Sequence, residues 1–190
     1  MKLNQLAASL LFAGTLLFTG CGSDDATSST STPPANSAAV THQTSVTTTT
    51  GERIAVNVTS EGFVFGGYEG KPVVLEFYGD TCPHCVESIP AYNNLQSKYG
   101  NDILLLTIDA PGQYATLNNA GLQGFVATHG ITYRTVSQEN QGNMKAYTEE
   151  LIGPMNAVPY VLVMNKNGAI ASRMIGPNAA QLEAAIKDVL

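Results

Sequence analysis

The chain has 190 residues, of which 44% are apolar and 13% charged, and 9 Lys and Arg against 15 Asp and Glu give it a formal net charge of −6. This length fits one domain with an appendage better than two full domains. The acidic balance and the lack of a basic cluster argue against nucleic-acid binding, and three cysteines are too few for a disulfide-rich scaffold.

The N-terminus has the order of a secretory signal peptide, and we predict that this signal covers residues 1–20. A positive charge at Lys2 precedes an apolar run over 6–18 and then small residues before Cys21. The run has no polar face, which disfavours a buried amphipathic helix, and it is shorter than the roughly 20 residues that span a bilayer. Residues 17–21 resemble a bacterial lipobox, which implies cleavage before Cys21 and its lipidation. The alternative is plain secretion with a free Cys21.

Residues 21–51 are predicted to be the lipidated cysteine followed by a flexible tether. Of the 28 residues from 23 to 50, 15 are Ser or Thr. Such a segment buries too little apolar surface to offset the entropy lost on ordering. The threonine run at 47–50 could form a strand, but no apolar flank offers it a packing surface.

Residues 52–190 are predicted to form one α/β domain. Alternating apolar residues indicate a half-buried strand over 54–58 with a partner at 62–65. Continuous apolar runs at 73–78 and 103–108 indicate strands buried on both faces. Further on we expect helices at 83–99, 114–129, 143–151 and 179–190, an edge strand at 131–136, and a hairpin of strands 160–164 and 169–175 around an Asn-Gly turn. The order predicts a central mixed sheet with helices on both faces and an N-terminal β lead-in.

The sequence Cys-Pro-His-Cys at 82–85 stands where a strand is expected to pass into a helix. One thiol then lies at the helix N-terminus and the other one turn later, close enough to form a small disulfide. Free N–H groups and the positive end of the helix dipole stabilise a thiolate on Cys82. Pro83 suits the first helical position, and His84 adds a hydrogen-bond donor. We predict Cys82 as an exposed attacking thiol, Cys85 as a more buried resolving thiol, and a redox-active Cys82–Cys85 disulfide.

Two other uses of this motif remain open. A structural zinc site needs more ligands, and no second CxxC is present; His84 or His129 would have to complete a metal-binding or metal-delivery site. The motif could also be an inert structural disulfide. A bridge across so short a loop would restrict the unfolded chain little and would therefore add little stability. We therefore predict no metal and no cofactor beyond the redox-active disulfide.

The domain resembles the thioredoxin superfamily on these residues. The lead-in strands, the inserted helix and the tether resemble its TlpA/ResA-like branch of membrane-tethered thiol–disulfide oxidoreductases. Residues 75–78 and the Cys-Pro-His-Cys motif are similar to the DsbA branch, whose members oxidise thiols in secreted proteins. Among peroxide-reducing enzymes of the same fold, a Thr usually stands three residues before the attacking cysteine, where this chain has Gly79.

The resemblance implies roles for residues outside the CxxC motif. Glu76, six positions before the first cysteine, corresponds to a buried acid that moves a proton to or from the resolving thiol. Pro90 corresponds to a proline that kinks the active-site helix. Val158-Pro159 corresponds to a cis-proline site packed against the disulfide, where the backbone of Val158 offers hydrogen bonds to a substrate strand.

Two residues beside the motif depart from the family. Thr81 replaces the usual aromatic residue, and Asp80 is expected to oppose thiolate formation. Asp109 and Pro111 follow a central strand; they could line a cleft, but we interpret them as ending the strand.

The leading hypothesis is an extracytoplasmic, lipid-anchored thiol–disulfide oxidoreductase that acts as an oxidant. The main alternative is a TlpA/ResA-like disulfide reductase, for example in cytochrome c maturation. The expected partners are cysteine-containing secreted or membrane proteins and a membrane redox partner, and we expect a monomer.

Overall fold

The structure is a computed structural model, and it describes residues 38–190 except positions 111 and 113. The predicted signal peptide, Cys21 and the tether up to residue 37 lie outside the described residues. The described part of the chain forms the elements β1 (Val40–Thr47), β2 (Arg53–Thr59), β3 (Phe63–Phe65), β4 (Val73–Tyr78), α1 (Pro83–Tyr99), β5 (Leu104–Asp109), α2 (Asn119–His129), β6 (Arg134–Val136), α3 (Met144–Ile152), β7 (Tyr160–Met164), β8 (Ile170–Ile175) and α4 (Ala179–Lys187).

A five-stranded mixed sheet forms the centre of the domain. Its strand order is β6-β5-β4-β7-β8. The first three strands run parallel, and β7 and β8 form the antiparallel hairpin that the Asn-Gly turn predicts. Every residue of β4 and β5 is buried, which confirms that these apolar runs are central strands covered on both faces.

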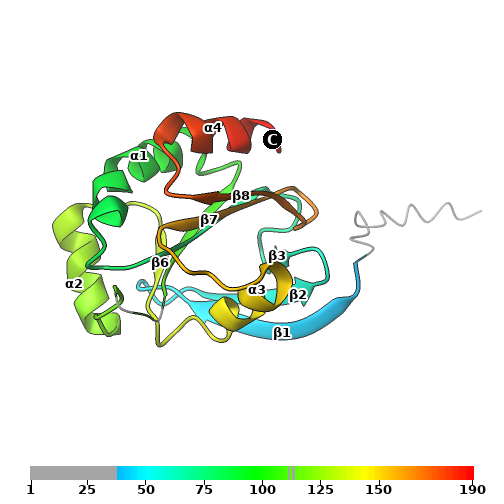
Figure 1. Ribbon diagram of the computed structural model, residues 1–190, viewed down its shortest axis with the longest axis horizontal. Coiled ribbons are helices and arrows are strands. Elements are labelled where there is room, and N and C mark those ends of the chain that lie inside the picture. The colour runs from blue at the N-terminus through cyan, green and yellow to red at the C-terminus, as the bar shows by residue number, and fades with distance from the viewer. Residues whose placement is uncertain (1–37, 111, 113) are drawn as a thin grey trace, which may run out of the picture. The chain divides into compact units, whose positions relative to one another are not determined.

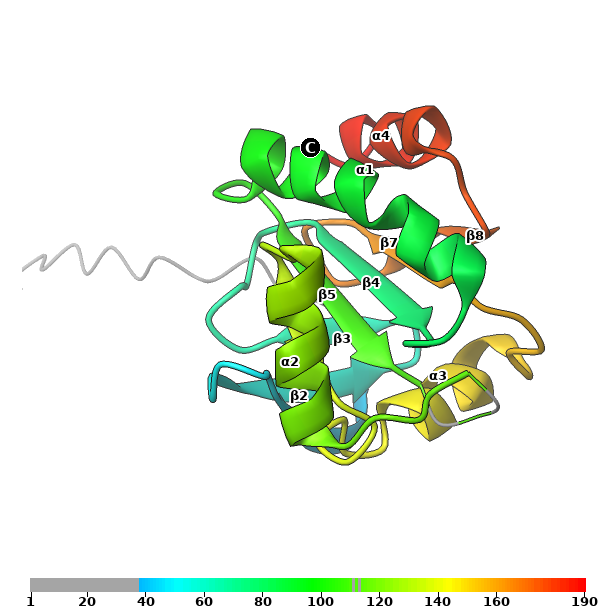
Figure 2. The same ribbon diagram turned by 90° about the vertical axis from the view of Figure 1, so that its left-hand side faces the viewer.

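Different layers cover the two faces of this sheet (Figures 1 and 2). Helices α1 and α4 pack on one face, where Tyr92 and Leu182 meet alternate side chains of the central strands. The antiparallel sheet β1-β2-β3 and helix α3 pack on the other face, where Phe63 and Met144 join the larger of the two cores. The predicted α/β fold class and the paired lead-in strands are therefore confirmed.

The folded domain begins earlier in the chain than the sequence predicted. Strand β1 lies inside the expected tether and pairs antiparallel with β2 along its length. Only Val46 is fully buried in β1, because the outer face of this strand remains in solvent. A strand with one buried side chain lacks the apolar alternation that sequence reasoning uses, and the boundary at residue 52 was wrong for this reason.

Helix α2 is also shorter than predicted, since it begins at Asn119 rather than at residue 114. Asn118 is its N-cap, and the Asn118 side chain accepts a hydrogen bond from Gly121 N at 2.9 Å. The preceding residues 114–118 form neither helix nor strand and lie against the loop before Cys82. Within the described residues, no helix is both long enough and apolar enough to cross a bilayer.

Candidate active site

The two cysteines occupy the first turn of α1, as the spacing predicts. Cys82 is the N-cap with an extended backbone, Pro83 is the first helical residue, and Cys85 follows one turn later. Val86 N donates to Cys82 O at 3.1 Å, so the helix starts directly from the first cysteine. Both thiols are free in the structure.

The exposure of Cys82 differs from the prediction. Cys82 is 4% exposed and Cys85 is 3% exposed, so the two residues are about equally buried. They pack in a cluster with Tyr78 and Leu122, against which Val158 also lies. The first turn of α1 is covered by α2 and the segment before β7, which a reading of local spacing alone does not reveal.

Val158 contacts the sulfur of Cys82. The Cys82 thiol donates to the Val158 carbonyl oxygen at 3.7 Å. The Val158–Pro159 peptide bond is cis, the isomer that the family resemblance implies. The structure thus brings Val158 and Pro159 to the CxxC motif, whereas their contacts with a substrate stay a prediction.

Glu76 lies in the middle of β4, on the side of the sheet that faces α1. It pairs with Thr107 of β5 and Val161 of β7, and it is 3% exposed. Burial raises the pKa of Glu76 from 4.5 to about 8, because a charged carboxylate loses its hydration there. The nearby Tyr92 hydroxyl lowers this pKa slightly. A carboxyl with this pKa can hold or release a proton near neutral pH.

The pKa of the Cys85 thiol depends on its burial, on Cys82 and on Glu76. Burial raises the pKa of the Cys85 thiol, a side-chain hydrogen bond with Cys82 raises it further, and the charge of Glu76 acts in the same direction. Cys85 therefore stays protonated until a base takes its proton. Glu76 is the buried carboxyl whose charge raises the pKa of Cys85, and its role in proton transfer stays a prediction.

His84 lies in the first turn of α1, but its side chain faces away from the sulfurs. Its side chain is 83% exposed and pairs with Glu87 at 3.4 Å. Pro90 lies inside the helix. His129, considered as a metal ligand, instead packs against Phe125 within α2, with the two ring planes tilted by 41°. Within residues 38–190 except 111 and 113, no three His, Cys, Asp or Glu side chains are grouped so that they could hold a metal ion.

Asp80 has a function in the structure that the sequence did not indicate. It was expected to place a negative charge beside Cys82, but its buried carboxylate accepts three hydrogen bonds from the 114–118 segment. Thr116 N donates at 2.6 Å, Thr116 Oγ1 at 2.8 Å and Leu117 N at 3.0 Å. These donors compensate the charge of Asp80.

Asp109, which the sequence indicated only as a residue that ends a strand or lines a cleft, contacts Asp80. Asp109 is fully buried at the end of β5, and its Oδ1 accepts from Asp80 N at 3.2 Å. Burial and the nearby Asp80 charge raise the pKa of Asp109 from 3.8 to about 8. Parallel neighbouring strands place their carboxyl ends together, so the Asp after a buried run was a usable signal.

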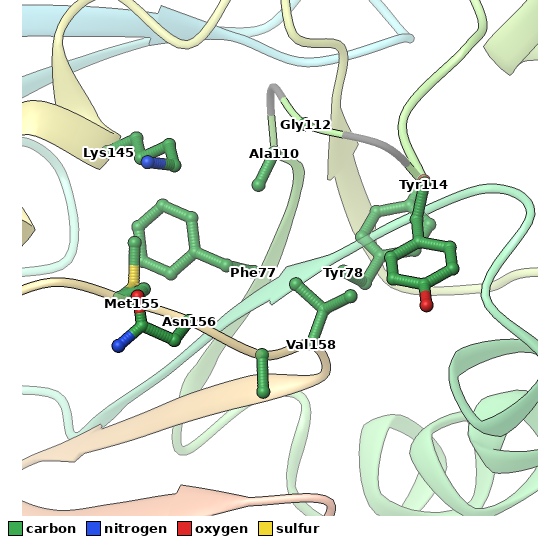
Figure 3. Close-up of a pocket in the computed structure, with 10 residues that line it drawn as sticks. Phe77, Tyr78, Ala110, Gly112, Tyr114, Lys145, Met155, Asn156 and Val158 are labelled. Carbon is green, nitrogen blue, oxygen red and sulfur yellow. The ribbon is translucent and has the colours of Figure 1, made fainter.

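A cavity of about 230 Å³ opens beside the CxxC motif, between the ends of β4 and β5 and the segment before β7. Phe77, Ala110 and Val158 form much of its apolar lining. Figure 3 shows Lys145 and Met155 on one side of the cavity and Tyr114 on the other. Because Val158 contacts Cys82 and also lines this cavity, a polypeptide bound here would lie next to the sulfur.

Comparisons with known proteins agree with this geometry. The family model described as Redoxin matches residues 35–190. Thiol-disulfide oxidoreductase ResA of Bacillus thuringiensis is 26% identical over 125 residues, which are 64% of this chain and 65% of that relative. The match thus spans slightly less than two thirds of the relative's length.

Solved structures show the same fold at low sequence identity. StoA from Bacillus subtilis has a TM-score of 0.57 and 19% identity, and the match covers 77% of this chain and 98% of StoA. The exposed lipoprotein thioredoxin from Streptococcus pneumoniae has a TM-score of 0.60 and 17% identity, covering 77% and 99% of the two chains. These likenesses confirm the thioredoxin-like fold.

Proposed function

Since the chain belongs to the Redoxin family and is a TlpA/ResA-like member of the thioredoxin superfamily, we propose that it is a thiol–disulfide oxidoreductase whose reacting groups are Cys82 and Cys85. The observation that carries this proposal is the pair of free thiols in the first turn of α1, with the Glu76 carboxyl buried beneath them. The relatives named thiol-disulfide oxidoreductase ResA support it.

The reaction follows from the different environments of the two thiols. In the reductive direction, the Cys82 thiolate attacks one sulfur of a partner's disulfide, and the other partner sulfur leaves and takes up a proton. Cys85 then gives its proton to the Glu76 carboxylate and attacks the Cys82 sulfur. This closes the Cys82–Cys85 disulfide, releases the partner's second sulfur, and transfers two electrons to the partner. In the oxidative direction the same steps run backwards, and Glu76 returns the proton to Cys85.

The purified protein tests this proposal directly. We expect it to exchange disulfides with a reduced or oxidised cysteine-containing protein, and we expect Cys82→Ser to abolish the exchange. Cys85→Ala should still attack but should accumulate mixed disulfides, which mass spectrometry can identify. Full activity of Cys82→Ser would overturn the proposal.

We propose that the physiological direction is oxidation of partner thiols. The similarity of residues 75–78 and of the Cys-Pro-His-Cys motif to the DsbA branch, whose members oxidise thiols in secreted proteins, supports this direction. The disulfide reductase is the second candidate, and the similarity to ResA supports it. Equilibration in glutathione buffers separates the two, because a potential near that of thioredoxin, about −270 mV, would defeat the oxidant.

We further propose that the protein works outside the cytoplasm as a monomer anchored through lipid on Cys21, and that a membrane partner reoxidises it. The signal-like residues 1–20 and the lipobox-like residues 17–21 support this location, as does the likeness to an exposed lipoprotein thioredoxin. Labelling of cells with a palmitate analogue should mark the wild type and the Cys82→Ser control, but not Cys21→Ser. Equal labelling of Cys21→Ser would overturn the lipid anchor.

A further inference from the structure

Asp80 joins the loop before Cys82 to the segment before α2. Asp80 lies in the turn that follows β4, and it is 7% exposed. All three donors to its carboxylate come from Thr116 and Leu117. Hydrogen bonds to an ionised acceptor are about twice as strong as neutral ones, so this carboxylate is a strong attachment point for the segment.

The neighbouring residue strengthens the same attachment. Thr81 N and Thr81 Oγ1 both donate to the Tyr114 carbonyl oxygen, each at 3.1 Å. The two residues before Cys82 therefore hold the segment from 114 to 117 at both of its ends. Tyr114 in turn forms one side of the cavity beside the CxxC motif.

Asp109 supports Asp80 from the sheet. Its Oδ1 accepts from Asp80 N, and its Oδ2 is buried without a hydrogen-bond partner among the described residues. Burial and the nearby Asp80 charge raise the pKa of Asp109 to about 8, so Asp109 can remain neutral beside Asp80.

We propose that Asp80 is a positioning residue that determines how tightly a partner polypeptide binds, because its carboxylate holds the 114–117 segment, whose Tyr114 lines the cavity next to Cys82. This inference rests on the proposed function and adds a determinant of partner binding to it. The contrary interpretation is that Asp80 acts through its charge on the Cys82 sulfur.

The experiment compares Asp80→Asn and Asp80→Ala with the wild-type protein on two disulfide substrates. One is a cysteine-containing peptide disulfide, whose chain is expected to occupy the cavity. The other is hydroxyethyl disulfide, which is small enough to react at the Cys82 sulfur without occupying the cavity. We expect KM for the peptide to rise about tenfold in both variants, since losing hydrogen bonds to a charged group costs a factor of that order. We expect kcat for the peptide and the rate with hydroxyethyl disulfide to stay within about twofold.

Asp102→Asn is the matched control, because Asp102 is exposed and precedes the opposite end of β5. It should leave both substrates unaffected. A rise in KM with Asp102→Asn, or equal losses on both substrates in the Asp80 variants, would overturn the proposal.

Two further measurements separate this inference from the proposed function. Hydrogen exchange of the Thr116 and Leu117 amides needs no turnover, and it should accelerate at least about tenfold in Asp80→Asn; unchanged exchange overturns the positioning role even in an inactive protein. The pH dependence of Cys82 alkylation in Asp80→Asn should be the same as in the wild type. A shift of that profile to lower pH without a change in KM would show that Asp80 acts on the sulfur by charge.

Discussion

Cys82 Sγ lies 3.7 Å from the carbonyl oxygen of Val158, although the two residues are 76 positions apart in the chain. A carbonyl oxygen can only accept, so this contact requires the sulfur to carry its proton. We expect that a mixed disulfide at Cys82 removes this donor, and that a backbone N–H of the bound polypeptide then donates to the Val158 oxygen instead.

The first prediction concerns the reactivity of Cys85. In Cys82→Ser the remaining thiol should react slowly with iodoacetamide, and its rate should still be rising at pH 9, because burial raises the pKa of Cys85. Mass spectrometry of quenched samples measures the rate at each pH. The same variant unfolded in urea is the control, and it should titrate as an ordinary thiol near a pKa of about 8.5. A plateau by pH 8 in the folded variant would contradict the prediction.

The second prediction concerns the pH dependence of stability through Glu76. The pKa of Glu76 is about 8 in the folded state and 4.5 as the reference for the unfolded state. The unfolded chain therefore binds fewer protons between these values. The stabilising contribution is complete below about pH 4.5 and is lost as the pH rises toward 8, at roughly 1.4 kcal/mol per pH unit.

Glu76→Gln should remove that slope. Urea unfolding at pH 5, 6, 7 and 8 should show the variant gaining stability relative to the wild type as the pH rises. Glu87→Gln is the control, because its exposed carboxyl on α1 should leave the slope unchanged. Parallel pH profiles for wild type and Glu76→Gln would show that the carboxyl is not buried in the folded protein.

Much of the fold could be predicted from the sequence because the central strands are runs of mostly apolar residues. The runs at β4 and β5 are apolar at nearly every position, and the Asn-Gly turn between β7 and β8 fits the observed φ of 82° at Gly168. Strand β1 could not be found this way, since pairing with β2 rather than burial of its own side chains holds it in place.

The features of the site likewise separate into those that local sequence predicts and those that depend on contacts between distant residues. Local spacing placed Cys82 and Cys85 correctly at the start of α1, and the continuous apolar run of β4 around Glu76 made its burial predictable. The burial of Cys82 depends on Val158 and on α2, which lie far away in the chain. The hydrogen bonds of Asp80 likewise depend on a segment more than 30 residues later, and no local pattern signals such contacts.

The third prediction follows from the early start of the domain. A chain beginning at residue 52 should be less stable than one beginning at residue 38, because it loses β1 and exposes the core that Val46 covers. Burial of that one side chain is worth about 1.5–3 kcal/mol. The loss also removes the hydrogen bonds from Thr47 N to Asn140 O and from Thr49 N to Thr135 O. Equal unfolding midpoints in urea for the two chains would contradict the structure.

The fourth prediction tests the close approach between the loop before Cys82 and the 114–117 segment. A Cβ added at Gly79 would lie 2.4 Å from Tyr114 Cβ and 2.6 Å from Tyr114 O. Because backbone atoms cannot yield as the end of a flexible side chain can, Gly79→Ala should force the two segments apart. We expect a loss of about 1–3 kcal/mol in the free energy of unfolding.

Gly124→Ala is the matched control for this substitution. Gly124 lies within α2, and a Cβ there meets no atom within 4 Å. Alanine in a helix interior is favoured over glycine by about 0.5–1 kcal/mol, so this variant should be more stable than the wild type. Opposite signs for the two variants in urea unfolding are expected from the contacts of Gly79 and Gly124. If Gly79→Ala were as stable as Gly124→Ala, the 114–117 segment could not lie against the loop before Cys82, and the attachment through Asp80 would fail with it.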